Sequence, residues 1–134
     1  MPRKSDSNNP GDWLTIAESE LEAVRVLTAR AISYDMCRGK LAEILEKVLK
    51  AELIRCGWFL GRTHDLERLR KELRTRDAEL ASGIQSLCTS LAEVYFTGRY
   101  PGFDLEDPDW PDFRVKLEQV TRLLEKVRAR VGGA

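Results

Sequence analysis

The sequence is poor in the residues that build metal sites and disulfide frameworks. It has one histidine, His64, and three cysteines, an odd number without a CxxC pair: Cys37, Cys56 and Cys88. Such a set argues against a disulfide framework and against a structural zinc site. We therefore expect a protein of the reducing cytoplasm, and we predict neither a bound metal nor a cofactor.

Net charge and long apolar runs are also missing. The 22 basic and 22 acidic residues cancel, so no field of the whole molecule attracts nucleic acid or an anionic membrane, and such binding needs a local patch. No apolar run approaches the roughly 18 residues that span a bilayer, and none follows the basic residues near the start. We expect a soluble protein that is not exported and does not bind a membrane.

Helical periodicity is the strongest pattern present, since 43% of the 134 residues are apolar and no segment alternates as a strand does. Apolar residues recur at spacings of three and four in four long segments. We predict helices from Trp13, capped by Asp12, to Ala31; from Leu41, after Gly39, to Ile54; from Leu80 to about Thr97; and from Phe113 to Val131. A short fifth helix, capped by Thr63, carries Leu66, Leu69 and Leu73.

These segments predict an all-α fold, an up-and-down bundle of four long helices plus one short helix. We expect a single domain over residues 12–131, between a polar, disordered lead at 1–11 and a tail at 132–134. The second predicted helix has an apolar surface wider than one stripe. We therefore place it at the centre of the bundle and expect it to face a partner subunit as well.

Four short motifs, in this order, resemble those of the HEPN domain, a family named for higher eukaryotes and prokaryotes nucleotide-binding. They are Trp13-Leu14 with Ala17-Glu18 and Leu21, then EKVLKA at 46–51, RTHDL at 62–66, and Tyr95 with RYPG at 99–102. The resemblance extends from about Trp13 to Val127. Glu43 departs from it, since many members carry a glutamine before the EK pair.

The resemblance implies a helical domain, often a homodimer and commonly encoded beside a minimal nucleotidyltransferase in toxin–antitoxin or defence modules. Many HEPN proteins are also metal-independent endoribonucleases, whose signature is an arginine, four to six further residues, and a histidine. Here that arginine would stand at position 57, 58 or 59, and these residues are Gly57, Trp58 and Phe59. The ribonuclease motif is therefore absent from the sequence. The corresponding site would form only if Arg62 or Arg99 reaches His64 in the folded protein.

The candidate ligand-binding residues lie in these motifs: Glu46, Lys47, Lys50, His64, Asp65, Arg99 and Tyr100. Each has a structural alternative. Glu46, Lys47 and Lys50 lie on one helix, where Glu46 and Lys50 stand four apart as in a solvated salt bridge, and the others stand near helix ends. Our hypothesis is a non-catalytic protein that forms a homodimer and acts with a nucleotidyltransferase partner or a nucleotide. The alternatives are an RNA-cleaving enzyme that uses His64 with Arg62 or Arg99, and a purely structural helical adaptor.

Overall fold

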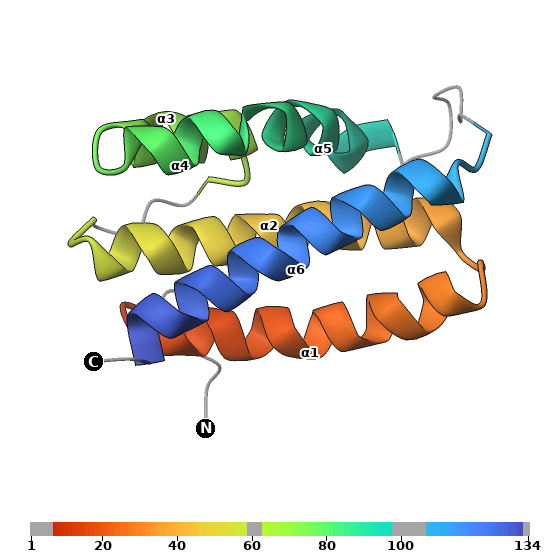
Figure 1. The fold of residues 1–134 in the computed structure, drawn as a ribbon, viewed down its shortest axis with the longest axis horizontal. Helices are drawn as coiled ribbons and strands as arrows, with labels where there is room; N and C mark the ends of the chain where they lie inside the picture. The colour runs from red at the N-terminus through yellow and green to blue at the C-terminus, as the bar shows by residue number, and fades with distance from the viewer. Residues whose placement is uncertain (1–6, 59–62, 98–106, 133–134) are drawn as a thin grey trace.

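The computed structural model describes residues 7–58, 63–97 and 107–132. These residues form six helices and no strand (Figure 1), which confirms the all-α prediction. The helices are α1 (Pro10–Ala29), α2 (Tyr34–Arg55), α3 (Leu66–Arg74), α4 (Ala78–Gly83), α5 (Gln85–Thr97) and α6 (Trp110–Gly132). None of them is long and apolar enough to cross a membrane.

The helix α2 is the centre of the bundle. It lies between α1 and the layer of α3, α4 and α5, and α6 crosses over it (Figure 1). Ile44, Leu45 and Val48 on α2 have no exposed surface. The wide apolar surface of α2 is thus covered by helices of the same chain, so it no longer gives a reason to expect a partner subunit there.

The start of α1 differs from the prediction. The helix begins at Pro10, and the side chain of Asn9, rather than that of Asp12, accepts a hydrogen bond from the Gly11 amide (2.9 Å). Proline suits the first helical position because its fixed φ is helical and it lacks an amide hydrogen that would be left unpaired. Apolar spacing did not reveal this start, since Pro10, Gly11 and Asp12 lie outside the apolar stripe.

The start of α2 was also predicted too late. The helix begins at Tyr34 and runs through Gly39, which is buried within it. Tyr34 packs edge-to-face against Trp110 and Phe113 of α6, with ring centroids 5.2 and 6.1 Å apart. Such aromatic packing stabilises the first turn of α2 against α6 and outweighs the low helix propensity of one glycine.

The helix predicted from Leu80 to Thr97 is two helices. The N-cap of α4 is Asp77, which accepts a hydrogen bond from the Leu80 amide, and the chain leaves α-helical geometry at Ile84 (φ −108°, ψ 9°) before α5 begins. Gly83, a poor helix former, precedes this break. The apolar spacing continues across the break because Ile84 and Leu87 stay buried on the same side.

Candidate functional site

The candidate site is centred on Glu46, a carboxylate of α2 that uses both of its oxygens. Lys50 Nζ donates to Glu46 Oε2 over 3.0 Å, and His64 Nδ1 lies 2.9 Å from Glu46 Oε1. The Lys50 ammonium also lies 5.3 Å from the centroid of the Trp13 ring, within the range of a cation–π contact. The structure therefore brings together three of the predicted site residues, and it adds Trp13, which the sequence had not assigned to the site.

Burial distinguishes the members of this trio. The side chains of Glu46 and Lys50 are 8% and 5% exposed, whereas that of His64 is 65% exposed. The alternative of a solvated bridge between Glu46 and Lys50 is therefore wrong: the pair is buried, and each charge depends on the other. Glu46 contacts the imidazole and is itself paired with Lys50, and His64 is the member that a ligand can reach.

Hydrogen bonds at the start of α3 fix the backbone beside His64. On the other side, α2 ends in a turn in which Gly57 has a φ of +89°, a left-handed conformation that favours glycine. Just before α3, Thr63 Oγ1 accepts from the Asp65 amide (3.1 Å), while Asp65 Oδ1 accepts from the amides of Glu67 (3.0 Å) and Arg68 (3.3 Å). Asp65, rather than Thr63 as predicted, is thus the N-cap of α3.

The remaining predicted site residues do not join the trio. Lys47 pairs with Glu20 of α1, which also binds Lys40 over 3.1 Å, so the contacts of Lys47 are with α1. The carboxylate of Asp65 is occupied by the first amides of α3. Arg62, Arg99 and Tyr100 lie outside the described residues.

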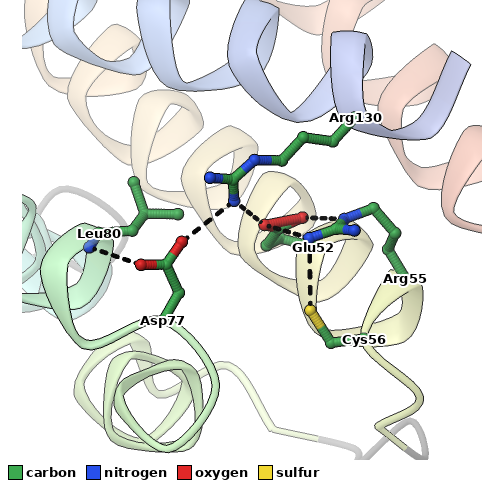
Figure 2. Close-up of polar contacts among 6 residues, drawn as sticks. All are labelled: Glu52, Arg55, Cys56, Asp77, Leu80 and Arg130. Atoms are coloured by element: carbon green, nitrogen blue, oxygen red, sulfur yellow. Dashed lines mark hydrogen bonds and ion pairs between the residues drawn. The ribbon is translucent and has the colours of Figure 1, made fainter. Parts of the chain in front are cut away.

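A second buried carboxylate, Glu52, was not predicted from the sequence. Its side chain is 1% exposed and binds two arginines, Arg55 of α2 and Arg130 of α6 (Figure 2). Arg55 Nε donates to Glu52 Oε1 over 2.5 Å, and Arg130 Nη1 reaches both Glu52 Oε2 and, over 3.2 Å, Asp77 Oδ2. This cluster ties α2, α6 and the start of α4 together.

The pKa values of the cluster follow from these contacts. The Leu80 amide, and then the Arg130 guanidinium, lower the pKa of Asp77, because both stabilise its ionised form. Hydrogen bonding to Glu52 raises the pKa of Arg55 and of Arg130. Asp77, Arg55 and Arg130 are therefore ionised at neutral pH, and the cluster acts as a cross-link between helices.

Metal chemistry has no evident site in the described part of the chain, where no group of three or more histidine, cysteine or acidic side chains is placed to hold an ion. The thiol of Cys88 is inert as a nucleophile, since burial raises its pKa to about 12. The side chains at the candidate site can thus offer positioned hydrogen-bond donors and acceptors and ionic contacts.

The fold and the site define an all-α domain in which buried carboxylates on the central helix hold side chains from distant segments. The family model of the HEPN domain matches residues 11–130, and the chain belongs to this family. The resemblance noted from the motifs is confirmed. No curated protein and no solved structure matches the chain. Membership of the family supports a function related to nucleotides or RNA in general terms.

Proposed function

We propose that this chain is a non-catalytic HEPN protein that binds a nucleotide at the His64 face and acts together with a protein partner. The observation that carries the proposal is the fixed imidazole of His64, which the buried pair of Glu46 and Lys50 holds at the surface. A histidine fixed in this way can contact a phosphate group. The absence of an arginine separated from His64 by four to six residues favours binding over cleavage.

The partner in this proposal is a minimal nucleotidyltransferase in a toxin–antitoxin or defence module, which the family context supports. We also propose a homodimer. Exposed apolar side chains on α1, Ile16 (47%) and Val26 (54%), offer a surface for it in place of α2. Light scattering on the wild type and on Val26→Glu tests this: we expect a dimer that the substitution weakens, and a monomer at high concentration contradicts it.

Nucleotide binding is tested by isothermal titration calorimetry with AMP, ATP and GTP. We expect at least one nucleotide to bind with a micromolar dissociation constant, and His64→Ala to weaken it by about tenfold, as loss of a charged hydrogen bond does. Lys71→Ala, on the exposed surface of α3, is the matched control. The proposal fails if no nucleotide binds at millimolar concentration or if the His64 variant binds as the wild type does.

One contact favours a second candidate, a metal-independent endoribonuclease. A carboxylate that binds one nitrogen of an imidazole orients the ring as a general base, and Glu46 stands in this relation to His64 at 2.9 Å. Such an enzyme also needs a guanidinium at the phosphate, which Arg62 or Arg99 would supply. An RNA cleavage assay distinguishes the two candidates, since only the enzyme depends on His64 for strand scission.

A further inference from the structure

A groove opens between two parts of the bundle on the side away from α1. The helix α6 packs against α1 and α2, whereas α5 packs against α2 and α3, and α4 against α3. Between α6 and the α4–α5 segment lies a groove of about 490 Å³. It is large enough to take several side chains of a bound segment.

The two walls of this groove differ in chemistry. The α4–α5 wall presents Leu80 and the edges of the buried Ile84 and Leu87, three residues at spacings of four and three, and it also carries the acidic side chains of Asp77 and Glu79. The α6 wall carries the exposed cations Arg122 and Lys126, which stand four residues apart. Side chains four apart on a helix lie on one face, so the two cations line the same side of the groove.

One end of the groove is held by the ionic cluster around the buried Glu52. Arg130, the next cation along the α6 wall, joins Asp77 at the start of α4 and the buried Glu52 (Figure 2). This bridge sets the separation of α6 and α4 before any ligand arrives. A preformed groove lowers the ordering cost of binding.

We propose that this groove binds an amphipathic helix of a partner protein, with an apolar stripe against Leu80, Ile84 and Leu87 and acidic side chains beside Arg122 and Lys126. This inference rests on the proposed function, which includes a protein partner, and it identifies the surface to which that partner binds. The wall from position 119 to position 130 is about 17 Å long, or three helical turns, at 1.5 Å per residue. Helix-in-groove recognition uses apolar anchors at spacings of three and four residues. The two cations favour a bound helix with acidic rather than basic side chains beside its apolar stripe.

Gly83 gives the sharpest variant, because it lines the groove and a Cβ added there meets no atom within 4 Å. Gly83→Leu therefore adds a large apolar side chain at the groove, on a Cβ that meets no other atom, and Gly83→Ala adds only a methyl group as the matched control. Lys126→Glu reverses a charge of the α6 wall. Lys71→Glu makes the same change of charge on the exposed surface of α3.

The probes are three fluorescent, hydrocarbon-stapled peptides of about four helical turns, a length set by the groove wall. One has a leucine stripe flanked by glutamates, the second has the same stripe flanked by lysines, and the third has serines in place of the leucines. We expect only the first to bind by fluorescence anisotropy. Gly83→Leu and Lys126→Glu should weaken it by about tenfold, whereas Gly83→Ala and Lys71→Glu should leave it unchanged.

The proposal is overturned if the glutamate peptide does not bind, if the lysine peptide binds as tightly, or if Gly83→Leu has no effect. It is also overturned if a mixed-sequence single-stranded RNA binds the wild type and loses its affinity in Gly83→Leu, since the groove is then a nucleic-acid site. Nucleotide titration of the same proteins separates the two proposals. If the protein binds a nucleotide but no peptide, only the proposal of a helix-binding groove is overturned. If it binds the glutamate peptide but no nucleotide, the groove stands and the proposed nucleotide binding is overturned.

Discussion

At the scale of single residues, the molecule depends on carboxylates that the sequence places among leucines. Glu46 and Glu52 lie on α2, the most buried helix, and each pairs with a cation of the same helix. Glu52 also pairs with Arg130 of α6. Removing one member of a buried pair leaves the other charge without compensation, which costs far more than the loss of an exposed salt bridge. The buried pairs therefore contribute to stability in a way that substitutions can measure.

Glu46→Ala should lower the free energy of unfolding by about 3–5 kcal/mol, because Lys50 then stays buried without its carboxylate. The double variant Glu46→Leu/Lys50→Met should recover most of this loss, since it removes both charges at similar volume. Urea denaturation measures both effects. Glu118→Ala is the control, because Glu118 and Arg122 form an exposed pair; a loss as small as that of the control would contradict a buried, interdependent pair.

Asp77 gives the stability a defined pH dependence. Its pKa is lowered in the folded state, so its contribution is present above the pKa of the unfolded chain, about 3.9, and is lost as the pH falls through the folded value. Asp77→Asn keeps a capping side chain but removes the charge, and should cost about 1–2 kcal/mol at pH 7. Denaturation between pH 7 and pH 3 should show the two proteins converging at low pH; a constant difference would exclude the ionised carboxylate as the cause.

At the scale of helices and turns, two glycines have opposite roles. Gly39 lies inside α2, where an added Cβ meets no atom within 4 Å, whereas Gly57 has a φ of +89° in the turn after α2. Replacing glycine by alanine lowers the conformational entropy of the unfolded chain and so favours the folded state, but alanine is strained at positive φ. Alanine substitutions at the two positions therefore measure two effects separately: helix propensity at Gly39 and backbone strain in a turn at Gly57.

Gly39→Ala should raise the free energy of unfolding by about 0.5–1 kcal/mol, and Gly57→Ala should lower it by about 1 kcal/mol or more. Thermal unfolding followed by circular dichroism compares them directly, with the wild type between them. Destabilisation by Gly39→Ala would mean that the helix is more tightly packed at this point than its open surroundings indicate.

The helices were predictable from the sequence, but their ends and contacts were not. Spacings of three and four identify a helix because it buries one stripe, as Leu117, Val120 and Leu124 do on α6. Helix ends depend on caps such as Asn9 and on packing such as that of Tyr34, which the apolar pattern does not contain. The motifs placed Glu46, Lys50 and His64 in one site, yet the bridge from Arg130 to Glu52 joins residues far apart in the chain and left no sequence signal.

At the scale of the whole molecule, this HEPN domain has two candidate binding faces. One carries His64, held by Glu46, and is proposed to bind a nucleotide; the other is the groove between α6 and the α4–α5 segment, proposed to bind a partner helix. We propose that the chain binds at these faces and does not cleave RNA. A fixed imidazole without the motif arginine is consistent with this claim, because general-base catalysis at a phosphate also needs a positioned cation.

The most direct test is cleavage of a mixed set of structured and single-stranded RNAs in EDTA, which suppresses metal-dependent contaminants. The purified wild type is compared with His64→Ala, after circular dichroism shows that both are folded. We expect no cleavage, or equal background cleavage by the two proteins. Products with 2′,3′-cyclic phosphate ends that disappear in His64→Ala would contradict this expectation and would make His64 and Glu46 the active site of a ribonuclease.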